Sequence, residues 1–509
     1  MQKINVVWLK KDVRLHDHAP LYHAIREELP VLLIYFFEPS VMNAPESDER
    51  HWRFAYQGVR ELQAKLAAHG HCAWYFHTEV IPVFDRLTAH YDIQHIFSHE
   101  ETGLAITFER DRAVIQWCKE KGIRWREFER DGIQRGIRTR QGWQEYWDHY
   151  MNSGPLQPAL EKLVTLQLDP LIKVDFDMPL PSSILRDHPQ FQKGGEDRAC
   201  ELLDSFTAKR AASYLRHLAR PHYSQESCSR LSPYLAHGHI SARRVYQATQ
   251  KAAPRLGKNI HQFHNRLWWR CHYIQKLETE YEIEKEHINR GFEGLKKPYN
   301  PHYFKAWSTG HTGFPMIDAS MRCLNQTGYL NFRMRAMLAT FWSFTLWQDW
   351  RVGATYLAKV FLDFEPGIHY PQFQMQAGMT GYHPLRIFNP IVQAKKYDDY
   401  GIFIRQWVPE LKTIPANFLA TPWELSTLEQ AFYNLKLGVD YPYPIVNYAE
   451  ATKRSKTLYW EYRKKEIVRE KLPGLWKKHS LPKDIEQYQQ DLFQGKDILI
   501  TESVMYDPG

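Results

Sequence analysis

The sequence lacks the motifs that mark several large classes of protein. Its six cysteines never form a Cys-x-x-Cys pair, which argues against a structural zinc site or a disulfide framework. Neither a Gly-x-Gly-x-x-Gly fingerprint nor a P-loop occurs, so the usual dinucleotide and P-loop sites are excluded. No apolar run reaches the roughly eighteen residues that span a bilayer, and the amino terminus has no apolar leader. We therefore predict no membrane contact and a cytoplasmic location.

What is present is a long, basic and aromatic chain. Its 509 residues favour two or more domains, and 43% apolar with 24% charged residues is typical of a globular protein. A net charge of +8 and a pI near 8.9 favour a polyanionic partner such as nucleic acid. Its seventeen tryptophans can fill cores, stack on bases or relay electrons, and core packing is the ordinary role for most of them.

The rhythm of the sequence divides the chain into four parts. In 1–130, short β-branched or aromatic runs alternate with helical periodicity, which predicts βαβ units and a Rossmann-like parallel sheet, an α/β domain. A Pro-rich and Trp-rich stretch, 131–195, is predicted to be a linker that runs over the surface. Most of 196–475 has apolar residues at helical spacing, which predicts a mostly α-helical second domain. The polar tail, 476–509, contains no motif that we can interpret.

Several motifs are specific enough to indicate a family. The chain opens with WLKKDVRLHDH at 8–18 and later carries TGFPMIDA at 312–319, RIFNP at 386–390, FIRQWVPEL at 403–411 and DYPYPIV at 440–446. Together they resemble the photolyase/cryptochrome family. The resemblance implies an amino-terminal α/β antenna domain followed by a mostly helical domain that binds FAD.

The same resemblance implies a function. It implies light-driven DNA repair, in which reduced FAD supplies an electron that splits pyrimidine dimers, so the expected partner is DNA that contains pyrimidine photoproducts. The alternative within the family is a cryptochrome-like blue-light photoreceptor that binds FAD without repair. A basic helical nucleic-acid-binding protein without a cofactor is a third hypothesis. We also expect a monomer, and we leave room for a second, antenna chromophore whose identity the sequence does not give.

Residues for the flavin phosphates come from one short run. Its hydroxyls and backbone amides precede a helix, where a phosphate can bind, although an ordinary helix cap has the same composition. The run resembles the phosphate-binding element of the family, with Cys228 in place of a threonine, and Tyr214 matches a tyrosine that touches the phosphates. The predicted residues here are Tyr214, Cys228, Ser229, Arg230, Leu231 and Ser232.

Residues for the flavin ring follow from the same resemblance. Arg335 and Asp363 match an ion pair that the family lays against the ring, and Asp363 with Glu365 falls where Asp-x-Asp contacts flavin and ribose. Without the resemblance, the two acidic residues would fit a solvated loop. Arg266 and Arg270 complete the predicted cofactor set.

The expected substrate pocket departs from the family pattern. Trp269 matches the tryptophan that stacks on damaged bases, and Arg270 and Arg333 are predicted to contact DNA. Arg266, however, stands where the family has a glutamate, and a guanidinium can only donate hydrogen bonds. Phe332 replaces a flavin-proximal asparagine.

Two further departures concern the flavin and its electron supply. His369 stands where photolyases place an asparagine beside flavin N5, and a histidine that changes charge near neutral pH would control protonation there. Of the three tryptophans that carry electrons to the flavin in the family, Trp350 matches the middle one, whereas Phe373 and Lys297 replace the inner and outer ones. Trp269, His369 and Trp350 are the predicted catalytic residues. The candidates for an alternative electron route are Trp268, Trp342, Trp347 and Tyr370.

Overall fold

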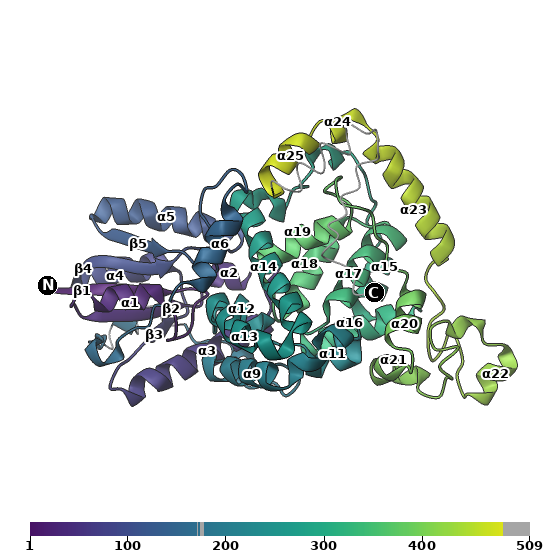
Figure 1. The fold of residues 1–509 in the computed structure, drawn as a ribbon, viewed down its shortest axis with the longest axis horizontal. Coiled ribbons are helices and arrows are strands. Elements are labelled where there is room, and N and C mark those ends of the chain that lie inside the picture. Colours follow the sequence, from purple (N-terminus) through teal and green to yellow (C-terminus); the bar gives the residue numbers. More distant parts are fainter. Residues whose placement is uncertain (170–171, 174–177, 482–509) are drawn as a thin grey trace.

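The computed structural model describes residues 1–169, 172–173 and 178–481 and has two parts that differ in secondary structure (Figure 1). Most of the predicted tail, 482–509, lies outside the described residues, as do 170–171 and 174–177 of the predicted linker. A sheet with its helices forms the amino-terminal part, and the remainder is mostly helical. Within the described ranges, every helix is too short or too polar to cross a bilayer.

Five parallel strands form the sheet, each where a β-branched or aromatic run predicts one. They are β1 (Gln2–Leu9), β2 (Val31–Phe36), β3 (Trp74–Phe76), β4 (Tyr91–His99) and β5 (Arg124–Phe128). Their order is β3-β2-β1-β4-β5. The connections run outward from the centre in both directions, so the sheet has a switch point between β1 and β4, the kind of place where α/β proteins often bind ligands.

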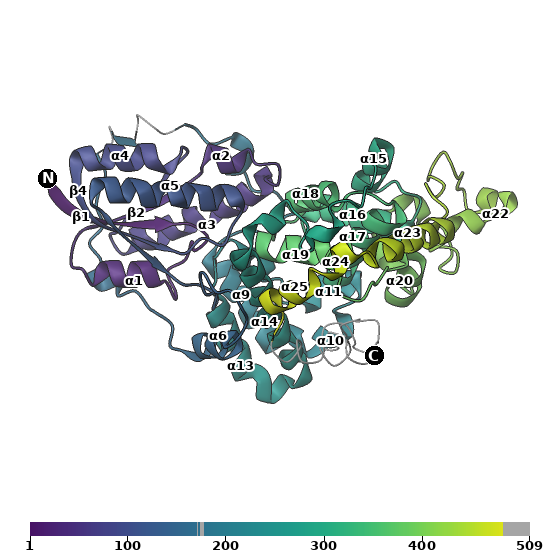
Figure 2. The same cartoon turned by 90° about the horizontal axis from the view of Figure 1, so that it is seen from above.

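Alternating side chains of the central strand β1 belong to two cores, one on each face of the sheet. Val6 and Trp8 belong to the core beneath α4 (Val80–His90) and α5 (Ala105–Lys121), whereas Val7 and Leu9 belong to the core beneath α1 (Ala19–Ile25) and α3 (Glu49–Ala68). The short helix α2 (Pro39–Met42) follows β2. Figure 2 shows α4 and α5 on one side of the sheet and α1 on the other. A strand covered on both faces needs a continuous apolar run, which β1 has.

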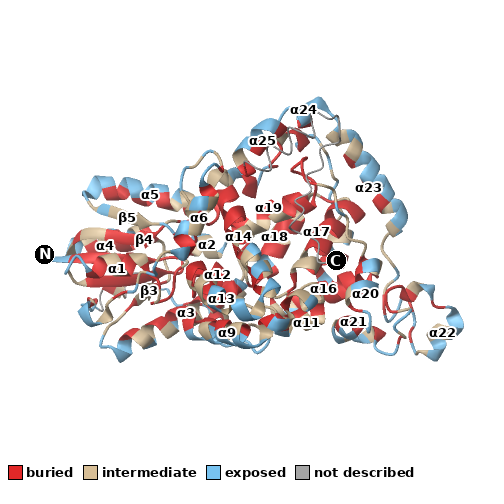
Figure 3. Ribbon diagram, viewed as in Figure 1, coloured by how far each residue is buried: buried red, intermediate tan, exposed pale blue. Residues whose placement is uncertain are grey.

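Helices build the rest of the chain. They are α6 (Trp143–Asn152), α8 (Ser182–Leu185), α9 (Glu196–Ala208), α10 (Tyr214–His217), α11 (Pro221–Ser227), α12 (Ser232–Ala236), α13 (Ala242–Leu256), α14 (Lys258–Thr279), α15 (Pro301–Thr309), α16 (Pro315–Thr327), α17 (Phe332–Thr340), α18 (Trp350–Val360), α19 (Pro366–Gln376), α20 (Pro390–Tyr397), α21 (Ile402–Trp407), α22 (Thr427–Phe432), α23 (Tyr448–Arg463), α24 (Glu466–Arg469) and α25 (Leu472–His479). A π-helical turn, Phe341–Thr345, continues α17. Buried residues concentrate on the inner helices α14 and α17 to α19, whereas α22 and α23 are largely exposed (Figure 3).

The predicted linker does not simply run over the surface. Its helix α6 buries Trp143, Trp147 and Met151 to 2% exposure or less, and these side chains join a core with α9, α13 and α14. The expectation of a surface connection for this part of 131–195 is therefore wrong. The prolines favour a surface connection, but the buried tryptophans hold this stretch in the core.

Four of the motifs that indicate the family take part in hydrogen bonds that hold turns and helix starts in place. Asp318 is fully buried and accepts hydrogen bonds from the backbone N–H and hydroxyl of Thr312, at 2.7 and 2.6 Å, and from the hydroxyl of Tyr441, at 2.5 Å. Asn389 caps α20 by accepting from the N–H of Ile391 and Val392. The carboxylate of Asp398 accepts from the N–H of Phe403 and Ile404, at the start of α21. These residues shape the helical part rather than its chemistry.

Replacing Asp318 with asparagine should destabilise the protein. The amide would retain one acceptor oxygen and would turn an NH₂ group toward donors, so we expect the unfolding free energy to fall by about 3 kcal/mol. Urea unfolding followed by circular dichroism measures this change. Asp204→Asn, at an exposed position of α9, is the control and should leave the unfolding midpoint unchanged. Equal midpoints for both variants would contradict the role given to Asp318.

Candidate functional site

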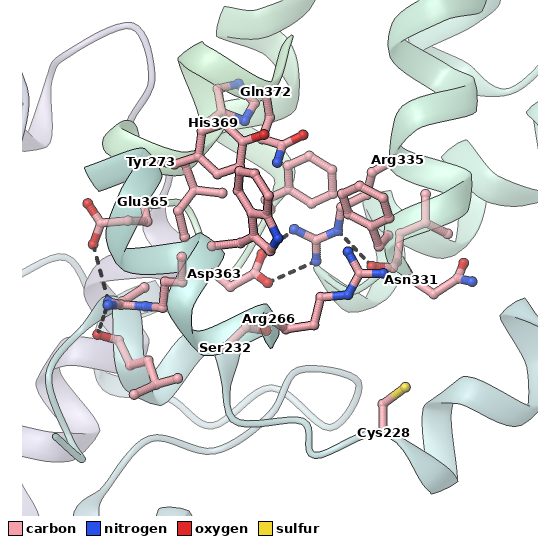
Figure 4. Close-up of a pocket in the computed structure, with 18 of the residues that line it drawn as sticks. Cys228, Ser232, Arg266, Tyr273, Asn331, Arg335, Asp363, Glu365, His369 and Gln372 are labelled. Atoms are coloured by element: carbon pink, nitrogen blue, oxygen red, sulfur yellow. Dashed lines mark hydrogen bonds and ion pairs between the residues drawn. The ribbon is translucent and has the colours of Figure 1, made fainter. Parts of the chain in front are cut away.

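A cavity of about 320 Å³ opens among α10, α12, α14, α17 and α19 (Figure 4). Its volume lies in the range of small-molecule and cofactor sites. The predicted residues that line it are Tyr214, Cys228, Ser229, Arg230, Ser232, Arg266, Trp269, Arg270, Arg335, Asp363, Glu365 and His369. Leu231, Arg333 and Trp350 are the predicted residues that lie outside its lining.

The predicted pairing of Arg335 with Asp363 is confirmed. Arg335 Nη1 and Nη2 donate to the two carboxylate oxygens of Asp363, each at 2.9 Å, which is the bidentate geometry of a strong ion pair. The Asp363 side chain is 6% exposed. Burial by itself would raise the pKa of Asp363, but the Arg335 guanidinium and the Ser232 hydroxyl lower it below its ordinary value. The pair therefore stays charged at neutral pH.

Other contacts fix Arg335 in this position. It lies in the first turns of α17, its Nε donates to the carbonyl of Leu330 at 2.7 Å, and its guanidinium lies 4.1 Å from the centre of the Phe361 ring. A cation held by hydrogen bonds and by an aromatic face cannot follow a ligand by changing rotamer. The wall of the cavity thus carries one positive charge at a fixed place.

Three side chains clamp the chain just before Asp363. The carbonyls of residues 360, 361 and 362 accept hydrogen bonds from Arg50 Nη1 at 2.6 Å, His51 Nε2 at 2.8 Å and His237 Nε2 at 3.3 Å, respectively. The last carbonyls of a helix, here α18, have no partner within the helix and need one elsewhere. Arg50 and His51 come from α3, so the α/β part of the chain positions the acidic residue of the cavity.

The Glu365 carboxylate is buried next to two cations but makes no hydrogen bond within the described part of the chain. The residue is 2% exposed, and its oxygens lie 3.7 Å from Lys11 Nζ and 3.8 Å from Arg270 Nη2. Arg270 itself is committed to Asp131, at 2.8 Å, and to the carbonyl of Leu235, at 3.1 Å. At 9% exposure, Arg270 faces the cavity from within its wall, a position that favours a cofactor over the DNA contact that we predicted.

These buried acceptors fit a flavin dinucleotide. Both oxygens of Glu365 and the Oδ1 of Asn331 are buried and accept no hydrogen bond from the described residues. A buried acceptor without a donor costs about 1–3 kcal/mol. The ribose and ribityl hydroxyls and the ring N–H of a flavin dinucleotide supply donors of this kind, whereas an apolar ligand supplies none. Asn331 is not among the residues predicted from the sequence. Its position at the start of a helix, directly before Phe332, is the sequence signal that could have identified it.

The run at 228–232 forms a tight, basic corner of the cavity. Arg210 binds the carbonyls of Cys228 and Ser229, and Arg230 adopts φ +63° with its guanidinium 3.5 Å from the centre of the Tyr329 ring. Burial raises the pKa of the Cys228 thiol to about 12, so the thiol is neutral. Leu231 is 1% exposed and packs in the core instead of lining the cavity.

Arg266 points toward this corner. Its charge lowers the pKa of the Tyr214 hydroxyl, against the larger effect of burial, and its guanidinium lies 5.1 Å from the centre of the Phe332 ring. Arg230 and Arg266 thus bring positive charge to the end of the cavity where the phosphates of a dinucleotide are expected. Arg266, at the family's glutamate position, thus lines the cavity together with the predicted cofactor residues.

His369 does not change charge near neutral pH. Burial lowers its pKa to about 4, with Arg335 adding to the shift. Its Nε2 lies 2.8 Å from the carbonyl of Ala354 and must donate to it, so Nδ1 of the neutral ring is an acceptor. The expectation that His369 titrates near neutral pH is therefore wrong, and the ring offers a lone pair instead of a switchable charge.

An aromatic wall stands on α14. Trp269 lines the cavity together with Tyr273, one helical turn later, and their ring centres lie 5.7 Å apart. Trp268 contacts Trp269 edge-on at 4.9 Å. Arg333 lies on α17 outside the lining, with its guanidinium 4.7 Å from the centre of the Tyr397 ring. Flat apolar rings at a cavity wall are suited to stacking on a ring-shaped ligand.

The residues at the family's electron-carrier positions have separate surroundings. Trp350 is buried beside Tyr370, with ring centres 6.4 Å apart, and Phe373 lies 6.1 Å from His369 at the cavity. Lys297 donates to the carbonyl of Ser343 and lies 4.4 Å from the centre of the Trp347 ring. Trp342 packs on Trp307 at 4.8 Å. Tyr370 is thus the candidate that touches both Trp350 and residues of the cavity.

A second polar cluster lies at the switch point of the sheet. Asp12, His18 and His99 are all buried, and the ligand atoms of these residues lie within 4.8 Å of one another, close enough for a metal ion. Asp12 Oδ2 lies 2.6 Å from His99 Nδ1 and 3.2 Å from His18 Nε2, while His18 Nδ1 caps α1. The Asp12–His99 hydrogen bond accounts for one of these contacts, whereas His18 Nε2 faces Asp12 without a hydrogen bond among the described residues.

Acidification should remove the stability that the neutral His51 contributes to the folded protein. His51 accepts from the N–H of Asp48 and donates to the carbonyl of Phe361, so it must be neutral, and burial lowers its pKa from 6.5 to about 4. Unfolded His51 binds a proton that folded His51 refuses, so its contribution is complete above about pH 6.5 and is lost as the pH falls toward 4.

The expected loss for one such histidine at pH 5 is about 2 kcal/mol. Urea unfolding at several values between about pH 7.5 and pH 5 measures the slope. His51→Gln should flatten part of it, because glutamine does not titrate in this range. A stability that does not change between pH 7 and pH 5 would contradict the neutral histidines.

Two family models match the chain. The model described as "DNA photolyase" matches residues 5–136, and the model described as "FAD binding domain of DNA photolyase" matches residues 263–461. The second match contains Arg335, Asp363, Glu365 and His369, and thus most of the cavity's α17 and α19 walls. The chain therefore carries the FAD-binding domain of this family, and the predicted cofactor, FAD, is confirmed at that level.

Relatives of this chain carry two kinds of name. A deoxyribodipyrimidine photo-lyase of Alkalihalophilus pseudofirmus is 26% identical and covers 90% of this chain and 98% of the relative, and a cryptochrome DASH of Gloeobacter violaceus is also 26% identical, covering 90% and 97%. A solved bacterial class III photolyase from Agrobacterium tumefaciens has a TM-score of 0.79 at 25% identity, over 91% of this chain and 98% of that one. An archaeal photolyase from Sulfolobus tokodaii, solved with two FAD molecules, has a TM-score of 0.71 at 26% identity, over 90% and 100%. Because the two family models together match more than half of the chain, the protein belongs to the photolyase/cryptochrome family, and its relatives carry the names of both branches.

Proposed function

We propose that this protein repairs pyrimidine dimers in DNA by light-driven electron transfer from bound FAD. The observation that carries the proposal is the cavity itself, where a bidentate Arg335–Asp363 pair and an aromatic wall led by Trp269 face the same space. Relatives named photolyase support the proposed repair function. The positive net charge supports a polyanionic partner.

The chain's own residues would bind and tune the cofactor. Arg335 favours negative charge on a ring beside it, and its pairing with Asp363 holds this cation in place. Glu365 and Asn331 would accept hydrogen bonds from hydroxyl and N–H groups, and Arg230 and Arg266 would face the phosphates. When bound and reduced, FAD supplies the single electron for the chemistry, a task that protein side chains do not perform themselves.

The substrate would enter from the Trp269 side. A dimer must leave the base stack to reach the cavity, and this costs a few kcal/mol, less for damaged bases than for intact ones. Stacking on Trp269 would offset part of that cost. Arg333, beside the cavity, remains a proposed contact to the DNA backbone.

The alternative is a cryptochrome-like photoreceptor. The specific observations that favour it are the replacement of two expected tryptophans by Phe373 and Lys297 and the neutral His369 at the flavin position. Relatives named cryptochrome DASH are as similar to this chain as those named photolyase. A flavin-loaded protein that leaves dimers intact under blue light would favour this alternative.

Several accompanying predictions belong to the same proposal. They are a monomeric state, a cytoplasmic location, a second chromophore of unidentified chemistry in the α/β part, and the division at 1–130, 131–195, 196–475 and 476–509. Size-exclusion chromatography with light scattering and the absorbance spectrum of the purified protein test the first and third of these.

Asp363→Asn should abolish stable flavin binding. The variant leaves Arg335 without its counter-ion in a mostly buried site, at a cost of about 3 kcal/mol. We expect the flavin retained per protein, measured by absorbance after desalting, to fall by tenfold or more at limiting FAD. Asp187→Asn is the control, since Asp187 is 64% exposed and pairs with the exposed Lys193 and with Gln57, away from the cavity. Full flavin retention in D363N would contradict the site.

Trp269→Ala should weaken repair, whereas Trp269→Phe should retain most of it. Loss of one stacked ring costs about 1–3 kcal/mol, so we expect dimer-DNA affinity to fall roughly tenfold to a hundredfold. Light-dependent loss of cyclobutane dimers from an irradiated oligonucleotide measures repair, and fluorescence anisotropy measures binding. Equal repair by W269A and the unchanged protein would overturn the stacking role, and no repair by a flavin-loaded unchanged protein would overturn the proposed function.

A further inference from the structure

We propose that His287 accepts the indole proton of Trp350 when light oxidises Trp350 to reduce the bound FAD. The inference rests on FAD binding and on an electron path to the cavity, and it is independent of whether the product is DNA repair or a light signal. It assigns a proton acceptor to Trp350, which is the one tryptophan present at the three electron-carrier positions of the family.

The three side chains involved lie in a line from the interior to the surface. Trp350 is 1% exposed, and its Nε1 donates to His287 Nδ1 at 2.9 Å. An indole N–H can only donate, so His287 Nδ1 carries a lone pair and its other nitrogen, Nε2, carries the hydrogen. His287 Nε2 lies 3.8 Å from the carboxylate of Glu293, whose side chain is 47% exposed.

Burial makes a positive charge on Trp350 unfavourable. Removing one electron from an indole without water around it leaves a cation with no hydration. The Arg351 guanidinium lies 5.4 Å from the centre of the Trp350 ring and repels that charge further. Transfer of the proton to His287 moves the charge toward Glu293 and solvent, so the oxidised indole ends as a neutral radical.

The surroundings of His287 keep its Nδ1 unprotonated at neutral pH, so that it accepts the indole N–H. Burial lowers the pKa of His287 to about 4, Arg351 and Lys297 lower it as well, and Glu293 and Asp349 act in the opposite direction. The resting imidazole is therefore neutral. A low basicity also means that the proton transfer is driven by oxidation of Trp350 and not by the histidine alone.

An aromatic path connects Trp350 to the cavity. The Tyr370 ring centre lies 6.4 Å from that of Trp350 and 5.4 Å from that of His369, which lines the cavity. Photoexcited oxidised FAD is the one-electron acceptor. Trp350 supplies the electron, its Nε1–H bond breaks, and an Nδ1–H bond forms on His287, which leaves a neutral tryptophan radical, an imidazolium and a flavin reduced by one electron.

Transient absorption of the FAD-loaded protein after a blue flash tests this step. In the unchanged protein we expect the neutral tryptophan radical and a slower radical deprotonation in D₂O. His287→Asn keeps an acceptor for the indole N–H but is a much weaker base, so we expect the radical cation to persist, with the equilibrium fraction of deprotonated radical falling about tenfold for each pKa unit of basicity lost. Trp350→Phe should remove the tryptophan radical signal.

A matched variant separates the relay from general damage. His264→Asn removes another partly buried histidine whose pKa is also about 4, away from this path, and should behave like the unchanged protein. The proposal is overturned if H287N forms the neutral radical as fast as the unchanged protein, if D₂O has no effect in the unchanged protein, or if W350F reduces its flavin equally well. A protein that passes these tests but repairs no dimers would sink the repair proposal alone, and one without flavin absorbance would sink the shared premise.

Discussion

The structure depends on one buried ion pair. Arg335 and Asp363 meet from α17 and from the turn between α18 and α19, and their two parallel hydrogen bonds hold these elements at the distance that keeps the cavity open. A buried pair of this kind contributes little net stability, because desolvation cancels most of its attraction. Its value lies in placing a permanent cation at a wall where a flavin ring is expected, in a family whose chemistry changes the charge of that ring.

Much of the fold follows from short-range patterns. Continuous apolar runs such as that of β1 gave the doubly covered parallel sheet, and helical spacing gave the second part. Patterns failed where a contact joins distant segments. The prolines of 131–195 suggest a surface linker, yet Trp143 and Trp147 pack against α13 and α14. These helices lie on the order of a hundred residues later in the sequence, and hydrophobic periodicity detects only local structure, not contacts between distant segments.

The candidate site shows the same limit in its chemistry. The family resemblance predicts that Arg335 pairs with Asp363 and that Tyr214, Glu365 and His369 share one site. In the structure the pair forms, and the other three residues line the same cavity. It could not say that Arg270 is committed to Asp131, that Leu231 packs in the core, or that burial keeps His369 neutral. Such properties depend on what surrounds a side chain in space, and no spacing of residues encodes that.

The carbonyl clamp ahead of Asp363 has a consequence for how such proteins diversify. Two of its three donors, Arg50 and His51, belong to the sheet-bearing part, while the acid they position belongs to the helical part. Exchanging the amino-terminal part for that of a relative would therefore disturb the floor of the flavin cavity, however well the borrowed sheet folds. The sheet-bearing part thus supplies two of the contacts that position an acid of the cavity, and it is a component of this site as well as a separately folded layer.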